Sequence, residues 1–89
     1  MSEVHQAITK HSNRQHQLVK TFVQLEGQRE AYIEDAVQRC KEGLPFTVEG
    51  INQVTDEINA LAKNGIVPTR KRVTPEMVKE YVARKYGNN

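Results

Sequence analysis

The chain has 89 residues, enough for one small domain but few for a deep apolar core. Its only cysteine, Cys40, excludes an intrachain disulfide, and its apolar runs are too short for a membrane-spanning segment or a signal peptide, so we expect a cytoplasmic protein with no membrane contact. The net charge of +2 is unevenly divided, with −3 over residues 1–62 and +5 over residues 63–89. A short chain with neither disulfide nor metal is commonly stabilised by oligomerisation, so we expect a homodimer.

The first 42 residues predict a long helical segment. Positions in it recur with gaps of four and three residues, which places them on one face of a helix as a heptad seam: Val4, Ile8, His11, Gln15, Leu18, Phe22 and Leu25. His11 and Gln15 lie where a helical dimer would favour apolar residues, so the seam is either thinly buried there or uses these groups to fix its register. The candidate self-association residues are therefore the apolar members: Val4, Ile8, Leu18, Phe22 and Leu25.

The path of the chain at Gly27 is open to two interpretations. A long helix can tolerate one internal glycine, which costs roughly 1 kcal/mol relative to alanine. The alternative is a tight antiparallel hairpin at residues 26–28, although no Ser, Thr, Asn or Asp is placed there to cap a second helix. Gly43, followed by Pro45, then ends the first helical unit.

Residues 47–87 predict a two-helix unit. Thr47 is the expected N-cap of its first helix, with Phe46 packing onto Ile51. The apolar face of this helix comprises Ile51, Val54, Ile58 and Leu61. We expect Asn64 and Gly65 to end the helix and Ile66 to fold back onto that face.

The last helix has a strong start signal in Thr74, Pro75 and Glu76. Its expected buried face comprises Met77, Val78, Tyr81, Val82 and Tyr86, and Gly87 is its expected end. The sequence thus predicts an all-α protein with a single domain over residues 1–89. A long N-terminal helical segment, either one continuous or kinked helix or a hairpin, precedes a C-terminal pair resembling a helix-turn-helix.

The sequence offers no catalytic, cofactor or metal site. His5, His11 and His16 are six and five residues apart, which points them around the helix instead of at one ion. Cys40 lies on the apolar stripe, where a structural cysteine is expected. The acidic residues between Glu26 and Asp35 are interleaved with arginines and predict a solvated face. We therefore expect a non-enzymatic protein with no cofactor.

The C-terminal half is similar in broad arrangement to helix-turn-helix modules of plasmid and repressor type, through Gly65, Pro68, Thr69 and Val73. This resemblance implies nucleic acid as a candidate partner. The candidate nucleic-acid contacts are the basic residues Arg70, Lys71, Arg72, Lys79 and Arg84. Two features oppose nucleic-acid binding. Glu76 and Glu80 would repel phosphate, and the connection of residues 65–74 is longer than the usual turn of the motif.

Three stretches carry a resemblance that extends over nearly the whole chain: MSEVHQAI, EAYIEDAV and PTRKRVTPEMVKEYV. They resemble a family of short uncharacterised proteins from endospore-forming Gram-positive bacteria, of the YpbS-like kind. This resemblance implies a bacterial cytosolic setting and no particular activity. The leading hypothesis is a homodimeric helical protein that binds an unidentified protein partner, and the alternative is DNA binding through the basic C-terminal half.

Overall fold

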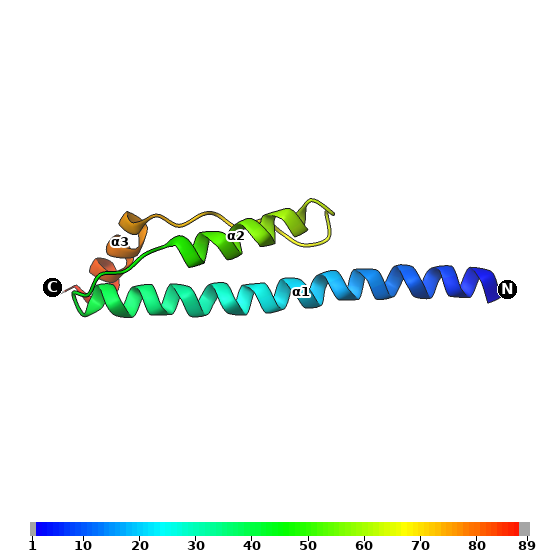
Figure 1. The fold of residues 1–89 in the computed structure, drawn as a ribbon, viewed down its shortest axis with the longest axis horizontal. Coiled ribbons are helices and arrows are strands. Elements are labelled where there is room, and N and C mark those ends of the chain that lie inside the picture. The colour runs from blue at the N-terminus through cyan, green and yellow to red at the C-terminus, as the bar shows by residue number, and fades with distance from the viewer. Residues whose placement is uncertain (1, 88–89) are drawn as a thin grey trace.

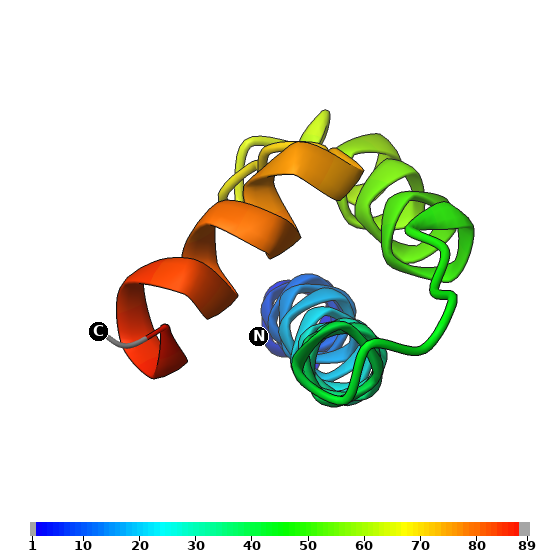
Figure 2. The same ribbon diagram turned by 90° about the vertical axis from the view of Figure 1, so that its left-hand side faces the viewer.

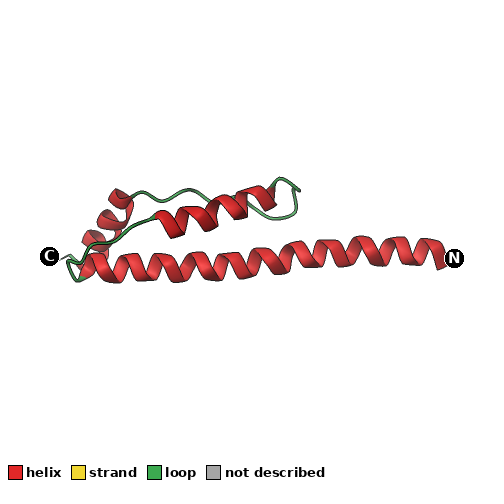
Figure 3. Cartoon of the chain, in the orientation of Figure 1, coloured by secondary structure: helices red, strands yellow, loops and turns green. Residues whose placement is uncertain are grey.

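The computed structural model describes the backbone of residues 2–87 and the side chains of residues 14–87. Over this part of the chain it contains three helices and no strand: α1 (Ser2–Lys41), α2 (Glu49–Ala62) and α3 (Pro75–Tyr86) (Figure 3). The predicted all-α class, with a long N-terminal helix before two shorter ones, is confirmed.

Helix α1 runs without a break through Gly27, so the hairpin alternative is wrong. Its 40 residues correspond to about 60 Å of helix, and the molecule is 66 Å long but only 18 × 17 Å across. A Cβ atom added at Gly27 would meet no heavy atom within 4 Å. No contact within the chain therefore requires a glycine at this position.

The end of α1 follows the predicted glycine signal. Gly43 has a positive φ of 75°, and the Leu44 amide donates a 2.8 Å hydrogen bond to the Arg39 carbonyl. These features close the last turn of the helix, because glycine adopts the left-handed conformation without a steric penalty.

Helix α2 begins one residue later than predicted. Val48 occupies the N-cap position, while the Thr47 hydroxyl accepts a 3.1 Å hydrogen bond from the Glu49 amide and so still caps the first turn. Ile51, Val54 and Ile58 are buried and Leu61 is half-buried, which confirms the predicted apolar face.

The turn after α2 differs from the prediction in one residue. Gly65 has the expected positive φ, at 76°, but Ile66 does not fold back onto the helix. It is 40% exposed, and Val67 is buried in its place. Because the chain becomes extended before Pro68, successive side chains point to opposite sides and only one of the two can face α1 and α2.

Helix α3 starts as predicted, since the Thr74 hydroxyl accepts a 3.2 Å hydrogen bond from the Met77 amide. The prediction of its buried face is largely wrong. Val78 is buried and Val82 half-buried, but Met77, Tyr81 and Tyr86 are 40–45% exposed.

The reason is that α3 packs on a single neighbour. It crosses α1 (Figure 2), and no Cα atom of α3 lies within 8 Å of a Cα atom of α2. A helix with one neighbour buries a narrower stripe than one packed between two.

The core therefore lies along the C-terminal half of α1, where both short helices pack (Figure 1). Among the described side chains, six apolar residues are buried: Ala36, Ile51, Val54, Ile58, Val67 and Val78. Past the turn at residues 63–67, the N-terminal part of α1 continues with neither short helix beside it (Figure 1).

Candidate interaction surfaces

The predicted self-association seam is only partly available for a second chain. Leu18, Phe22 and Leu25 are half-buried, and the Arg70 guanidinium lies over the Phe22 ring at 5.3 Å from its centroid. Val4 and Ile8 lie outside the residues whose side chains are described. The seam thus contacts its own chain at its C-terminal end and extends along the projecting part of α1.

Three of the five predicted nucleic-acid contacts form ion pairs within the chain. Arg70 donates to Glu26 at 2.7 Å, Arg72 lies 3.4 Å from Asp56, and Arg84 pairs with Glu80 one turn away on α3. The hydrogen bonds that the Arg70 guanidinium donates to the Glu26 carboxylate raise the pKa of Arg70 above its usual value.

The remaining two contacts, Lys71 and Lys79, have no ion-pair partner within residues 14–87. Both are exposed. Three of the five candidate contacts, all of them arginines, are therefore matched by carboxylates of the same chain.

A pair of asparagines on α2 fixes the connection between α2 and α3. The Asn59 amide group donates to the Arg70 carbonyl at 2.9 Å and accepts from the Arg70 amide at 2.8 Å. Asn52 does the same with Val73, at 2.8 and 2.7 Å. Seven residues, or two helical turns, separate the asparagines, which places them on one face of α2.

Arg29 of α1 contributes a third tether to this connection. Its Nε donates to the hydroxyl of Thr55 at 2.7 Å, and its Nη2 donates to the Lys71 carbonyl at 2.8 Å. Thr55 is fully buried and donates in turn to the Ile51 carbonyl. We did not predict these tethers, because the only sequence signal was a polar pair spaced seven residues apart within an apolar helix.

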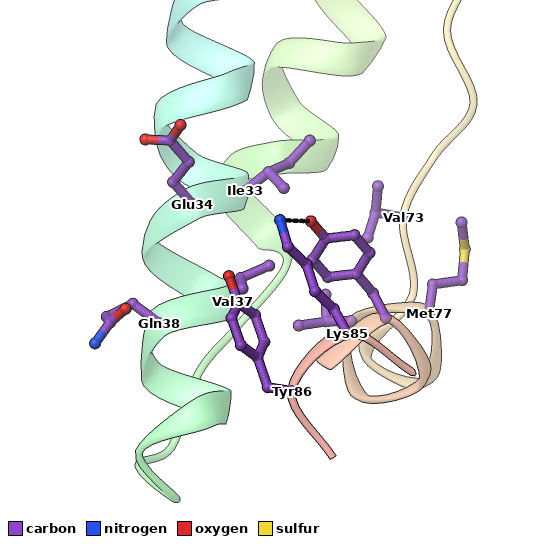
Figure 4. A pocket seen from close by; sticks show the side chains of 10 residues that line it. Ile33, Glu34, Val37, Gln38, Val73, Met77, Lys85 and Tyr86 are labelled. Carbon is purple, nitrogen blue, oxygen red and sulfur yellow. Dashed lines mark hydrogen bonds between the residues drawn. The ribbon is translucent and has the colours of Figure 1, made fainter. Parts of the chain in front are cut away.

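A cleft of about 570 Å³ lies between α1 and α3 (Figure 4). Its walls are mostly apolar: Ile33 and Val37 from α1, Val73 from the connection, and Met77, Val78, Tyr81 and Tyr86 from α3. Glu34 and Gln38 line its α1 side. Four of the five residues that we predicted as the buried face of α3, all but Val82, thus form one wall of an open cleft.

Two lysines lie against the tyrosines of this region. Lys85 donates a 3.1 Å hydrogen bond to the Tyr81 hydroxyl, and this bond raises the pKa of the Lys85 ammonium. Lys41 of α1 lies over the Tyr86 ring, 4.4 Å from its centroid. The Lys41–Tyr86 contact attaches the end of α3 to α1 through a cation and an aromatic ring, whereas the Lys85–Tyr81 bond lies within α3.

We find no constellation suited to catalysis among the described side chains. No group of three His, Cys, Asp or Glu residues within this part of the chain is arranged to hold a metal ion. Cys40 is half-buried and packs against the core. None of the described helices has a stretch of the length and apolarity needed to cross a bilayer.

Comparison with known proteins gives the family. Residues 2–84 match the family described as "Protein of unknown function (DUF2533)". The chain belongs to this family. It is also 54% identical over 84 residues to the "Uncharacterized protein YpbS" of Bacillus subtilis (strain 168), an alignment that covers 94% of this chain and 99% of the relative. No solved structure matches the chain. The resemblance inferred from the three sequence stretches is thus confirmed, and the DUF2533 family carries no stated activity.

Proposed function

We propose that this DUF2533 protein is a non-enzymatic homodimer that acts by binding another protein, and that it self-associates through the projecting part of α1. The observation that carries the proposal is that this part of α1 extends past α2 and α3 (Figure 1). An isolated helix of about 15 residues or fewer is marginally stable in water, so a projecting helix gains stability from a partner.

The small core supports the same proposal. Six buried apolar side chains among the described residues are few for a stable monomeric domain. Packing the seam of one chain against another adds apolar burial to Leu18, Phe22 and Leu25, which are only half-buried in the single chain. The apolar seam residues proposed for this role are Val4, Ile8, Leu18, Phe22 and Leu25.

The test is the mass of the protein in solution, measured by light scattering on a sizing column. We expect a dimer whose mass does not change across micromolar concentrations. The double change Leu18→Lys and Phe22→Lys is expected to give a less stable monomer, because two charges then lie in the seam. The matched control is Gln17→Lys with Gln24→Lys, which adds the same charge at exposed positions on another face of the same turns. A monomeric parent protein would refute the proposal.

The alternative is DNA binding through the basic C-terminal half, with Arg70, Lys71, Arg72, Lys79 and Arg84 as contacts. Its support is the charge of +5 over residues 63–89. It is the weaker candidate, because Arg70, Arg72 and Arg84 already pair with carboxylates of the same chain. Only Lys71 and Lys79 would meet phosphate without first exchanging a partner.

A further inference from the structure

One face of α1 is exposed from residue 19 to residue 34, beside the face that α2 covers. Its residues follow one another at gaps of four or three, which places them on one side of the helix. We call this face the exposed stripe: the exposed Val19, Val23, Gly27, Glu30 and Glu34, continued at its C-terminal end by the half-buried Val37. Val23 is 61% exposed, the highest value among the large apolar side chains that the structure describes, and Val37 at the other end lines the cleft against α3.

Gly27 lies at the middle of the exposed stripe. A glycine inside a helix is destabilising, yet nothing in its own chain lies within 4 Å of where its Cβ would be. The missing side chain lets a second backbone come close at this point. The glycine alone does not identify the second backbone. The residues on either side of Gly27 do.

The two ends of the exposed stripe complement each other. The N-terminal end carries the exposed Val19 and Val23 with Lys20 beside them, and the C-terminal end carries the mostly apolar cleft, which has Glu34 on its α1 side and Lys85, bonded to Tyr81, on its α3 side (Figure 4). Lys20 and Glu34 are both exposed, and neither has an ion-pair partner within residues 14–87. A surface whose two halves complement each other fits a second copy of itself, related by a two-fold axis.

We infer that two copies of this chain pack with their α1 helices antiparallel along the exposed stripe, crossing near Gly27. Residues whose numbers sum to about 56 then face each other. Val19 of each copy lies against Val37 of the other and enters the cleft between α1 and α3. Lys20 of each copy lies within one helical turn of Glu34 of the other, on the same flank of the helix pair, which gives two symmetric ion pairs. The overlap over residues 19–37 is about 27 Å of helix.

The distribution of exposed apolar groups favours this arrangement. The structure describes eight exposed large hydrophobic side chains, and five of them belong to the exposed stripe or the α3 wall of the cleft: Val19, Val23, Met77, Tyr81 and Tyr86. One antiparallel contact brings all five next to apolar partners at two equivalent places. The Glu26 carboxylate beside the crossing point is already paired with Arg70, so it adds little repulsion towards Glu30 of the other copy.

This inference rests on the proposed self-association and assigns it to a different face of α1. The seam residues Leu18, Phe22 and Leu25 are half-buried against their own chain, whereas the exposed stripe lies on the neighbouring, uncovered side of α1. The two faces can therefore be tested separately.

The deciding experiment is a charge exchange measured by fluorescence-detected sedimentation velocity over a dilution series. Lys20→Glu and Glu34→Lys each replace two attractions with two repulsions, and we expect each to raise the dimer dissociation constant about tenfold. The double variant restores opposite charges and is expected to return to within about threefold of the parent. Glu57→Lys, at an exposed position of α2, is the matched control and should leave the constant unchanged.

A steric variant tests the crossing point. Gly27→Leu keeps the helix but adds a side chain where the two backbones meet, and we expect it to weaken the dimer at least about tenfold while the circular dichroism of the chain stays helical.

The possible results separate the two ideas. A parent protein that is monomeric at micromolar concentration overturns both. The inference is overturned if the dimer is unaffected by the charge exchange and by Gly27→Leu but dissociates with Leu18→Lys and Phe22→Lys. That result would support the seam as the dimer interface. Recovery in the double charge variant supports the antiparallel arrangement, because parallel helices would bring Lys20 against Lys20.

Discussion

At the scale of single residues, the fold depends on polar side chains that bridge the helices. Thr55 lies in the apolar face of α2, accepts a hydrogen bond from Arg29 of α1 and donates one to its own helix. Arg29 also holds the Lys71 carbonyl of the connection. A buried polar group is tolerated when it is hydrogen-bonded and costly when it is not. This small network therefore joins three segments at one point.

We predict that Thr55→Val lowers the free energy of unfolding by about 1–3 kcal/mol. Valine keeps the shape of threonine but leaves Arg29 Nε without its acceptor. Urea denaturation followed by circular dichroism measures the change. Thr55→Ser keeps the hydroxyl and should lose less than Thr55→Val, so a valine variant as stable as the parent would contradict the role assigned to this network.

At the scale of elements, the connection between α2 and α3 is ordered although it is neither helix nor strand. Asn52 and Asn59 each pair with both the amide and the carbonyl of one residue in it, at Val73 and at Arg70. These paired hydrogen bonds satisfy backbone groups that would otherwise need water. The connection therefore runs close along α2 and places α3 beside the C-terminal end of α1.

We predict that Asn59→Ala removes the protection of the Arg70 amide in hydrogen exchange and lowers the free energy of unfolding by about 1–2 kcal/mol, the usual net contribution of two hydrogen bonds. Gln53→Ala, at an exposed position of the same helix, is the control. Unchanged exchange at Arg70 in the Asn59 variant would show that the asparagine does not hold the connection.

The elements also show what the sequence could and could not predict. Caps and breaks depend on neighbouring residues, so the turn at Gly43 and the start of α3 at Thr74 were predictable. The exposure of Tyr81 and the cleft beside it were not, because they depend on α3 meeting α1 alone. The pairing of Arg70 with Glu26 joins residues 44 positions apart, and no local pattern reports such a contact.

At the scale of the whole molecule, the uneven charge distribution is partly balanced inside the chain. The part up to residue 62 carries −3 and the rest +5, and two ion pairs connect these parts, Glu26 with Arg70 and Asp56 with Arg72. The carboxylates of Glu26 and Asp56 already pair with these two arginines, so an external phosphate would have to replace them. The uneven charge of the two parts thus helps to hold the connection between α2 and α3 against α1 and α2.

This balance predicts how the protein responds to DNA. Binding that neutralises phosphates weakens with salt, by a logarithmic slope of about 0.9 per contact. If only Lys71 and Lys79 are available, fluorescence anisotropy of a labelled random duplex should give weak binding with a slope of no more than about 2 per chain. A slope of about 4.5 would mean that all five basic residues contact phosphate, and that Arg70, Arg72 and Arg84 leave their carboxylates to do so. In that case Lys71→Gln with Lys79→Gln would remove less than half of the slope, and DNA binding would replace protein interaction as the leading function.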